Sequence, residues 1–440
     1  MTVLISIIAI LLFCAPAWAT DYYVATTGND SNTCTQAQSI LTPKLTIASG
    51  STCLSAGDTL QIRVGTYTGP HGSGMPSGTN WSSPITYKAY NGEAVTWAAP
   101  ATDRALTLAS SQHHLIFDDI IFDGAAQTGS YDVIKITYQD PGTGAHHIRI
   151  QNSEIKNAGA QAVLLTGKAE GTCCVEILNN TMHGNGRFDT NFMHAVYSQV
   201  DDVIIKGNDI YNQSNGQNVH IFYDNASNNI IANNRLHDRV PGGTGSTVSI
   251  IAGVGTGHKI YNNIFYGSGA GINIDYGTSA QAYNNTIYGG NIAIGAESAG
   301  TVIITNNLID VAGGAQPFGI GIYAGASNTT VQNNLVIGGA FAGCGAAICN
   351  LAGKNTTLID NITSGSSLFT NPGAADFTIQ SGSTARNAGV STSPTVIDDF
   401  AGISRPQGPA YDIGAYEYVV SGHKLNATGK WTGTGKMVVQ

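Results

Sequence analysis

Short apolar runs flanked by paired asparagines recur along the chain. The segment NNIIANNRLHD, residues 228–238, holds two Asn-Asn pairs around Ile230, Ile231 and Ala232. Similar runs of Val, Ile, Thr and Tyr follow one another, broken by glycine, and no long stretch combines good helix formers with a helical period. The pattern predicts many short β-strands and almost no helix.

A repeat emerges when the segments are aligned on the second residue of each Asn-Asn pair. The aligned positions are Asp119, Ser153, Asn180, Asn208, Asn234, Asn263, Asn285, Asn307, Asn334 and Asn361. Neighbouring positions lie 22 to 34 residues apart, a period typical of solenoids and propellers. A propeller blade needs roughly 40 residues, and the leucine pattern of a leucine-rich repeat is missing. The spacing fits an all-β parallel β-helix of about ten or more coils, each with three short strands and three turns.

The paired asparagines have a structural explanation. A coil turns sharply between strands, and asparagine tolerates the left-handed backbone conformation that such turns need. In stacked coils the Asn amides can also hydrogen-bond along the ladder, as they do in cross-β stacks. The apolar pairs 230–231, 303–304 and 335–336 are expected to fill the interior. We therefore assign the asparagines to the fold and not to catalysis.

Composition supports this interpretation and narrows the partners. Only 11% of the 440 residues are charged and 55 are glycine, which suits an all-β or repeat architecture. The net charge is -9, with 19 Lys and Arg against 28 Asp and Glu. This charge argues against nucleic acid, because a phosphate backbone needs a basic stripe. An anionic polysaccharide is not excluded, since a local group of cations can exist on an acidic protein.

The two ends are expected to differ from the repeat. Residues 1–19 form an apolar run that ends in Ala-Trp-Ala, which we interpret as a secretory signal. The alternative is an uncleaved anchor, because the run lacks Lys and Arg; no other segment is long and apolar enough to span a bilayer. Residues 20–420 then form the β-helix domain, with an N-terminal cap and the first coils in 20–100, and residues 421–440 form a short β appendage or tail. We expect a secreted monomer, extracellular or periplasmic.

Six cysteines follow the signal, and an even number in an exported chain suggests disulfides. They are Cys34, Cys53, Cys173, Cys174, Cys344 and Cys349. We predict that the first two pair and that the last two pair, each closing a local loop. The adjacent middle two could form a strained ring or stay reduced. A zinc site is the alternative, but no Cys-x-x-Cys or paired-histidine spacing supports it, so we predict no metal ligand.

Three segments carry a resemblance to a known superfamily. DYYVATTGND (21–30), GDTLQIRVGTYTG (57–69) and the Asn-Asn ladder resemble secreted bacterial right-handed parallel β-helix proteins of the pectin-lyase-like superfamily. DFAGISRPQGPAYDIGAYEY (399–418) resembles their closing segment. The resemblance implies a single right-handed parallel β-helix. It leaves the activity open, because this superfamily holds lyases, glycoside hydrolases, epimerases and adhesins.

Charged residues and histidines gather in the middle of the ladder, between residues 183 and 259. His194 and His220 each lie 14 residues before a ladder position, and Tyr197 and Tyr223 each lie 11 residues before one. We therefore expect two imidazoles and two phenols stacked on neighbouring coils. If strand alternation turns His194 inward, it is instead a hydrogen-bonded interior residue. A long face with convergent polar side chains suits an extended polymer, so a polysaccharide is the expected partner.

The main hypothesis is β-elimination from a uronic acid polymer, which needs a base, a cation beside the carboxylate and an acid for the leaving oxygen. His194 would be the base, a tyrosine the acid, and an arginine would bind the carboxylate with two hydrogen bonds. A C5 epimerase would use the same groups. The candidates are, for catalysis, His194, Tyr197, Arg187, Asp189, His220 and Tyr223, and, for substrate binding, Asp224, Arg235, His237 and Asp238. Calcium, bridging carboxylates to a sugar acid, is a further candidate cofactor, although no acidic loop has a recognisable ligand spacing.

Two other functions stay open. A glycoside hydrolase needs two carboxyl groups roughly 5 to 9.5 Å apart, which Asp189 with Asp224, or Asp224 with Asp238, would supply. The clustered aspartates of a polygalacturonase are absent, which places a hydrolase behind a lyase or epimerase. A glycan-binding adhesin or surface rod would instead present a face without a perturbed acid or base.

Overall fold

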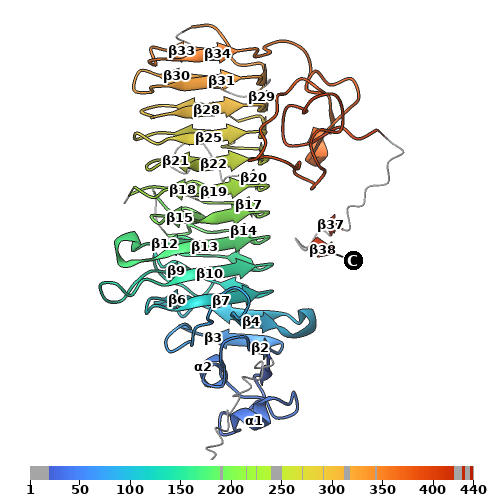
Figure 1. The fold of residues 1–440 in the computed structure, drawn as a ribbon. Helices are drawn as coiled ribbons and strands as arrows, with labels where there is room; N and C mark the ends of the chain where they lie inside the picture. Colours follow the sequence, from blue (N-terminus) through green and yellow to red (C-terminus); the bar gives the residue numbers. More distant parts are fainter. Residues whose placement is uncertain are drawn as a thin grey trace, which may run out of the picture.

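The computed structural model shows a rod in which the chain rises coil by coil (Figure 1). The structure describes residues 19–188, 192–214, 216–223, 225–238, 250–269, 271–290, 292–311, 318–341, 344–420, 429–431 and 437–439. The predicted signal, residues 1–19, lies almost wholly outside these ranges and stays a prediction. Within the ranges, no helix is long and apolar enough to cross a membrane.

Three long parallel sheets form the walls of the rod. Sheet A consists of β1 (Asp21–Val24), β2 (Thr59–Ile62), β4 (Ile85–Ala89), β7 (His113–Asp118), β10 (His146–Gln151), β13 (Cys173–Leu178), β16 (Ile204–Lys206), β19 (Ile230–Ala232), β22 (His258–Tyr261), β25 (Ala280–Tyr283), β28 (Val302–Thr305), β31 (Thr329–Gln332) and β34 (Thr357–Ile359). Sheet B consists of β3 (Gly65–Thr68), β5 (Val95–Ala98), β8 (Ile121–Asp123), β11 (Glu154–Lys156), β14 (Thr181–His183), β17 (Asp209–Tyr211), β20 (Arg235–His237), β23 (Ile264–Tyr266), β26 (Thr286–Tyr288), β29 (Leu308–Asp310) and β32 (Leu335–Ile337). Sheet C consists of β6 (Leu106–Leu108), β9 (Ile134–Ile136), β12 (Val163–Leu165), β15 (Val196–Ser198), β18 (Val219–Ile221), β21 (Ile250–Ala252), β24 (Ile272–Ile274), β27 (Ile292–Ala296), β30 (Phe318–Tyr323) and β33 (Ile348–Leu351). Each complete coil, from β4 to β33, contributes one strand to each sheet, which confirms the predicted all-β parallel β-helix.

In the described ranges, helix is confined to a few short turns, as the sequence pattern predicts. They are α1 (Cys34–Ala37), α2 (Ile47–Ser51), η1 (Tyr90–Gly92), η2 (Lys168–Glu170) and η3 (Pro372–Ala374). α1 begins after Thr33, whose hydroxyl accepts the Gln36 backbone N–H while the Gln36 side chain accepts that of Thr33. α2 places Ile47, 1% exposed, in the same core as Val24 and Leu60. This helix therefore covers apolar side chains at the N-terminal end of the rod.

The interior is a set of apolar files that run along the rod. One file comes from the middle of sheet A, and each of its members is fully buried: Ile177, Ile205, Ile231, Ile260, Ala282, Ile304 and Val331. Only one residue of each expected apolar pair points inward, because side chains alternate along a strand. Ile230 and Ile303 are half-buried on the outer face, and Leu335 packs in a separate cluster outside the rod.

A continuous ladder of buried side chains crosses the turn between sheets A and B. Each ladder asparagine donates its amide N–H both to the next ladder carbonyl and to a backbone carbonyl of the preceding coil. Asn234, for example, donates to Asn263 Oδ1 at 2.9 Å and to the Ile205 carbonyl at 2.9 Å, and its Oδ1 accepts the backbone N–H of Asn208. The rungs are Ser153, Asn180, Asn208, Asn234, Asn263, Asn285, Asn307, Asn334 and Asn361. The stacked amides predicted from the repeat are confirmed.

The two asparagines of a pair have different tasks. The first one takes the left-handed conformation, as in Asn233 and Asn262 with φ of 54° and 52°, and the second one forms the ladder. Asp119 also has a left-handed φ of 61°, so it stands at the first position and Ile120 stands at the ladder position, where its N–H donates to Ser153 Oγ. The expected alignment is therefore one residue off at this first coil.

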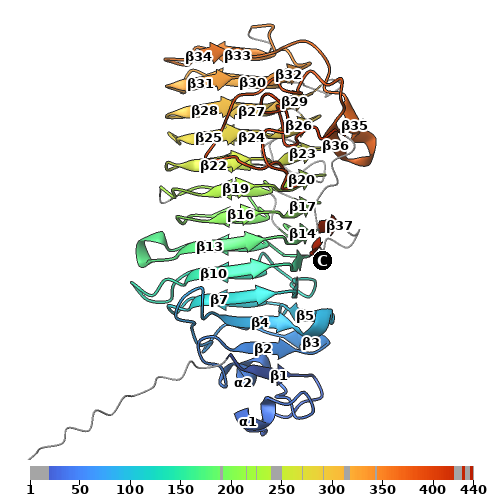
Figure 2. The same cartoon turned by 45° about the vertical axis from the view of Figure 1, so that its right-hand side comes forward.

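Residues 363–420 do not continue the coils as a closing cap. After β34 the chain returns along the outer face of sheet B, where β35 (Phe369–Asn371) and β36 (Asp376–Ile379) form an antiparallel pair (Figures 1 and 2). We call residues 363–420 the return segment. Phe377, 1% exposed, and Ile413 pack there with Ile264, Leu308 and Leu335 of sheet B. The predicted domain 20–420 thus contains a rod and a separate segment docked on its side.

The first asparagines of the pairs attach this segment to the rod. Asn262 donates to the Asp398 carbonyl at 2.7 Å, and Asn306 donates to the Val390 carbonyl at 2.6 Å. Within the segment, the fully buried Arg405 and Glu417 form an ion pair at 2.7 Å. The turn residues that bend each coil therefore also hold the return segment.

The cysteines pair as predicted. Disulfides join Cys34 to Cys53 and Cys344 to Cys349, and the adjacent Cys173 and Cys174, whose state the sequence left open, are also joined. In the last residues, β37 (Gly429–Trp431) and β38 (Met437–Val439) pair antiparallel, which confirms a short β appendage.

We predict that Asn263→Ala lowers the free energy of unfolding by about 3 kcal/mol or more, because each buried polar group left unpaired costs roughly 1–3 kcal/mol. The variant removes the acceptor of the Asn234 N–H and the donor to the Ile231 carbonyl. Urea unfolding followed by circular dichroism measures the change. Asn361→Ala is the matched control: it stands at the partly exposed last rung, where water can replace the lost bonds, and we expect a smaller loss. Equal losses in both variants would contradict the burial argument.

Candidate functional site

The outer face of sheet C carries polar and aromatic side chains on successive coils. Two outward columns run along it. The first column contains Lys135, Leu164, Tyr197, His220, Ile251 and Asn273, one residue per coil. The second column lies two residues further along the chain and contains, on six successive coils, Gln199, Phe222, Gly253, Asp275, Glu297 and Tyr323. We call these two columns, with the neighbouring Tyr223 and Tyr276, the sheet C strip.

His194 lies inside the rod and not on the strip. Its side chain is 1% exposed. Its Nδ1 accepts the Gln217 backbone N–H at 3.0 Å, and its Nε2 lies 3.0 Å from His220 Nδ1. His194 is therefore a buried, hydrogen-bonded histidine in this structure, and its predicted role as the base stays a prediction.

The register of the two expected histidines also differs from the sequence alignment. Tyr197, not His194, stands opposite His220 on the neighbouring strand. The turn from β18 to β19 contains residues 222–229, whereas the turn from β15 to β16 contains residues 199–203. The sequence alignment counted the same number of residues back from each ladder asparagine. Because the two turns differ by three residues, this count gives a partner for His220 that is three positions away from the true one. The structure therefore brings Tyr197 and His220 together, with ring centroids 5.4 Å apart.

Backbone hydrogen bonding fixes the tautomers of this pair. Because His194 Nδ1 accepts a backbone N–H, its proton sits on Nε2, which donates to His220 Nδ1. The neutral His220 ring then carries its own proton on Nε2. Burial lowers the pKa of His220 to about 4, so the ring is neutral at pH 7. His220 can therefore donate a hydrogen bond through its Nε2–H, and its low pKa makes it a weak base.

An aromatic group stands beside His220. Phe222 lies 4.4 Å from Tyr223 and 4.9 Å from Tyr276, between ring centroids, in both cases edge to face. Tyr223 and Tyr276 are 57% and 59% exposed, unusual for large rings. Exposed rings next to polar groups offer flat surfaces on which sugar rings can pack.

Two carboxyl groups meet on neighbouring coils above the aromatic group. Asp275, 9% exposed, accepts the backbone N–H groups of Tyr276 and Ser298 through Oδ1 at 2.7 and 2.9 Å, which fixes its orientation. Burial and the neighbouring Asp275 raise the pKa of Glu297, whose side chain hydrogen-bonds to Asp275 and Asn273. Glu297 can therefore hold a proton beside a carboxylate, the condition for a general acid.

The opposite end of the strip is basic. Burial and the nearby Arg104 lower the pKa of Lys135. Arg104 is paired with the buried Asp132 at 3.0 Å, and burial raises the pKa of that carboxyl. Lys135 stands on β9 and Asp275 follows β24, five coils further along, so roughly 24 Å separate them at about 4.8 Å per coil. The two ends cannot act on the same bond.

The expected carboxylate-binding arginines are engaged elsewhere. Arg187 donates to the backbone carbonyls of Gly124 at 2.7 Å and Asn157 at 2.8 Å, so it braces two coils. Arg235 lies on sheet B under the return segment, where it donates to the Ala375 carbonyl at 3.2 Å and to the Tyr416 hydroxyl at 3.4 Å. These contacts place neither guanidinium in the strip, and their role in binding a carboxylate stays a prediction.

The remaining predicted binding residues are also on sheet B or outside the described ranges. His237 hydrogen-bonds to Asp209 at 2.9 Å and to Asp238 at 2.8 Å, and it stacks on Tyr211 and Tyr266. Burial opposes its charge, but the two carboxylates outweigh burial and raise the pKa of His237. This stack is packing at the edge of the docked segment, not a part of the strip. Asp189 and Asp224 lie outside the described residues, and their roles stay predictions.

Sequence reasoning missed Asp275 and Glu297, although a signal was present. Asp275 lies 12 residues after Asn263, and Glu297 lies 12 residues after Asn285. The two ladder positions are 22 residues apart, and so are the two acids, so they must stack. Two carboxylates do not satisfy a calcium ion, which takes six to eight oxygen ligands, and the calcium candidate stays a prediction.

Comparisons with known proteins agree with this architecture. Residues 243–390 match the family model described as "Right handed beta helix region". This match and the order of the parallel strands show a right-handed parallel β-helix fold. The crystal structure of pectate lyase Pel9A is similar, with a TM-score of 0.54, 15% identity, and coverage of 92% of this chain and 98% of that chain. The mannuronan C-5 epimerase AlgE4 A-module of Azotobacter vinelandii is similar with a TM-score of 0.51, 15% identity, and coverage of 70% and 87%.

A search of curated proteins by sequence found no match. At 15% identity, the two structural neighbours show that this β-helix shares their fold and nothing finer. The activity must therefore be argued from the strip itself.

We predict opposite titrations for two histidines of this β-helix. In 15N-histidine NMR spectra, His220 should titrate with a midpoint of about 4 and carry its neutral proton on Nε2, and His237 should titrate above its ordinary value of 6.5. The stability that His220 contributes is present above pH 6.5 and is lost as the pH falls toward 4, because its pKa is lowered on folding. The contribution of His237 is present below pH 6.5 and is lost as the pH rises through its raised pKa. His220→Gln and His237→Gln assign the signals; a midpoint near 6.5 for His220 would contradict the hydrogen-bond chain.

Proposed function

We propose that this β-helix is an enzyme that cleaves glycosidic bonds of a polysaccharide at the upper part of the sheet C strip. The observation that carries the proposal is the carboxyl pair, in which Glu297 has a raised pKa beside the oriented Asp275. Cleavage of a glycosidic bond needs a proton for the leaving oxygen, and a raised pKa favours the protonated form of a carboxyl group. Glu297 gives its proton to the leaving oxygen, water attacks the anomeric carbon, and the proton released from that water restores the Glu297 carboxyl group; Asp275 sets the pKa and position of Glu297.

The neighbouring side chains support binding of an extended glycan. Tyr276 and Tyr223 offer exposed rings for sugar faces, and His220 directs an Nε2–H donor to the same surface. A polymer lying along the strip would meet one coil roughly every 4.8 Å, close to the length of one sugar unit. The similarity to a pectate lyase and to a mannuronan epimerase supports a polysaccharide as the substrate class.

Charge favours hydrolysis of a neutral polysaccharide at this pair over elimination from an acidic one. The groups that shift the pKa of Glu297 are Asp275 and Asn273, and no Lys or Arg of the described ranges is among them. A uronate would place a further carboxylate beside these acids without a cation to balance it. The β-elimination expected from the sequence therefore does not suit this end of the strip.

Elimination is the second candidate, and it belongs to the basic end. Lys135, with its lowered pKa, faces outward next to Arg104, and a lysine of this kind is suited to take a proton beside a bound carboxylate. The two candidates use different residues, so one experiment separates them.

Secretion is part of the proposal. The predicted signal at residues 1–19 and the three disulfides support an oxidising location, where such bonds persist.

We predict that residues 20–440 release reducing ends from a neutral polysaccharide and that Glu297→Gln slows this release by roughly 10²–10⁴-fold, the usual contribution of a positioned acid. Reducing-sugar assays on a panel of neutral and uronic acid polysaccharides, with ultraviolet absorbance for unsaturated ends, measure both reactions. Asp360→Asn, an exposed acid on another face, is the matched control and should keep full activity.

Two results would overturn hydrolysis at Glu297. One is unsaturated ends that disappear in Lys135→Met and persist in Glu297→Gln, which would assign elimination to the basic end. The other is glycan binding without any product in the whole panel, which would assign a binding rod. Thermal unfolding of each variant shows whether the loss of activity follows from a loss of fold.

A further inference from the structure

Three consecutive coils present a pair of metal-binding side chain types at the same place, where the strands of sheet A begin. β7 starts with His113 and His114, β10 starts with His146 and His147, and β13 starts with Cys173 and Cys174. Strand pairing places His113 opposite His146, and His146 opposite Cys173. The second members, His114, His147 and Cys174, all have left-handed φ angles of 52°, 53° and 60°. The repeated conformation turns each adjacent pair in the same way on three coils.

Within each histidine pair the ring nitrogens converge. Nδ1 of His113 lies 3.0 Å from Nδ1 of His114, and Nδ1 of His146 lies 2.8 Å from Nδ1 of His147. Rings of successive coils stack, with centroids 4.9 Å apart for His113 and His146 and 4.7 Å apart for His114 and His147. A tetrahedral ion with bonds of roughly 2.0–2.1 Å holds two nitrogens about 3.3 Å apart, so each pair needs to open by only a few tenths of an ångström to bind one ion.

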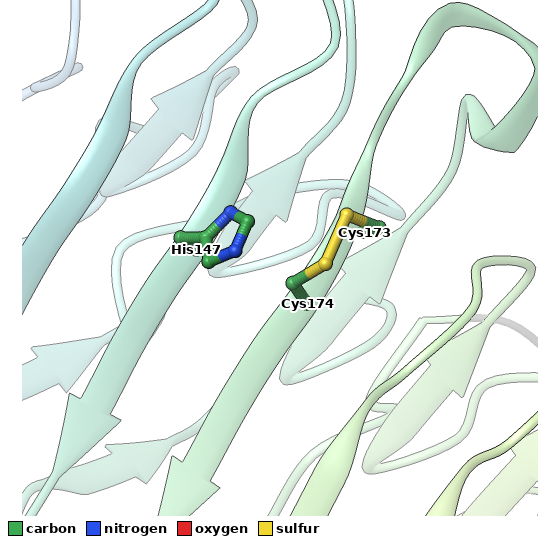
Figure 3. A group of neighbouring side chains, drawn as sticks. All are labelled: His147, Cys173 and Cys174. Carbon is green, nitrogen blue, oxygen red and sulfur yellow. A yellow bond between two sulfur atoms is a disulfide. The ribbon is translucent and has the colours of Figure 1, made fainter. Parts of the chain in front are cut away.

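The sulfur pair completes the group. Figure 3 shows the His147 ring facing the bond between Cys173 and Cys174. One ligand atom from each of these three residues lies within 4.8 Å of the other two, and all three side chains are half-buried. No other group of three such residues meets this condition in the described part of the chain.

The surroundings hold the group in place. Trp81 contacts His114 edge to face at 5.3 Å. The Arg149 guanidinium lies over the Trp81 ring at 4.5 Å and forms an ion pair with Glu176 at 2.6 Å.

We propose that His146, His147, Cys173 and Cys174 form a redox-gated binding site for a thiophilic transition ion of the Zn²⁺ type. With the disulfide closed, as in this structure, the sulfurs are not available, because the thiolate is the metal ligand. A dithiol reductant supplies two electrons and two protons to the disulfide, which becomes two thiols, and is itself oxidised to a disulfide. On ion binding the two thiols release their protons to solvent. Two thiolates and two imidazoles then give the four ligands of a tetrahedral zinc site.

This site is separate from the proposed glycan-cleaving site. Its residues stand on sheet A, and none of them belongs to the sheet C strip. The inference therefore does not rest on the proposed activity, and either can fail without the other.

The test measures Zn²⁺ binding by residues 20–440 against a chromophoric chelator, before and after treatment with a phosphine reductant. A phosphine is used because dithiols bind zinc themselves; it takes an oxygen atom from water as the disulfide becomes two thiols. We expect one Zn²⁺ per chain after reduction, bound about tenfold or more tightly than before, because thiolates are the preferred ligands of this ion. The gain should vanish in Cys173→Ser/Cys174→Ser and in His146→Gln/His147→Gln.

Cys344→Ser/Cys349→Ser is the matched control, since it removes another reducible pair far along the chain, and it should keep the gain. Zinc affinity that is equal in both redox states, that survives in Cys173→Ser/Cys174→Ser, or that depends on the control pair would overturn the proposal. A readout without variants guards against misfolding: Co²⁺ added to the reduced wild-type chain should give thiolate charge-transfer absorbance in the near ultraviolet. Absence of this band would also overturn the proposal.

Discussion

The buried amide ladder is the interaction on which the other features of this β-helix depend. Each rung, such as Asn234 or Asn285, needs a partner on the coil above and on the coil below, because an unpaired amide in a dry interior costs roughly 1–3 kcal/mol. A shift of one coil by a single residue would break bonds on two neighbouring coils at once. The ladder therefore fixes the height and phase of every coil at one corner of the rod. Variation in coil length must be absorbed at the other turns.

This constraint separates the three faces of the rod into different tasks. The corner that holds the ladder also presents the first asparagines, and their free amides bind the return segment, which covers the face of sheet B. Sheet C, on which the described return segment does not pack, keeps an outer face where polar and aromatic columns are exposed. At the start of sheet A, the repeated left-handed residues align histidines and cysteines from three coils. Because the ladder keeps one corner of each coil constant, the outer faces of sheets B and C and the start of sheet A can carry different side chains.

The sequence was sufficient to predict the features that the ladder determines. It was insufficient to predict contacts that depend on turns of variable length or on distant segments. The fold, the coil number and the amide stack follow from spacings that can be counted directly. The partner of His220 could not be counted, because the turn after β18 is three residues longer than the turn after β15. The side chain of Arg235 is held by hydrogen bonds to Ala375 and Tyr416, which lie 140 and 181 residues further along the chain. No local pattern reports a contact of that range.

A second limit of prediction from sequence concerns the density of charged residues. The middle coils were chosen as the candidate site because they contain many charged residues and histidines. A stretch rich in charged residues suggests a functional site, yet these side chains already have partners within the fold. His237 is bonded to Asp209 and Asp238, and Arg187 is bonded to backbone carbonyls. Asp275 and Glu297 stand in coils with few charges, and the groups that shift the pKa of Glu297 include no cation. Burial, followed by the neighbouring Asp275 carboxylate, raises the pKa of Glu297. In a stacked fold, two lone acids at equal distances from ladder residues are therefore a stronger sign of chemistry than a dense run of charges.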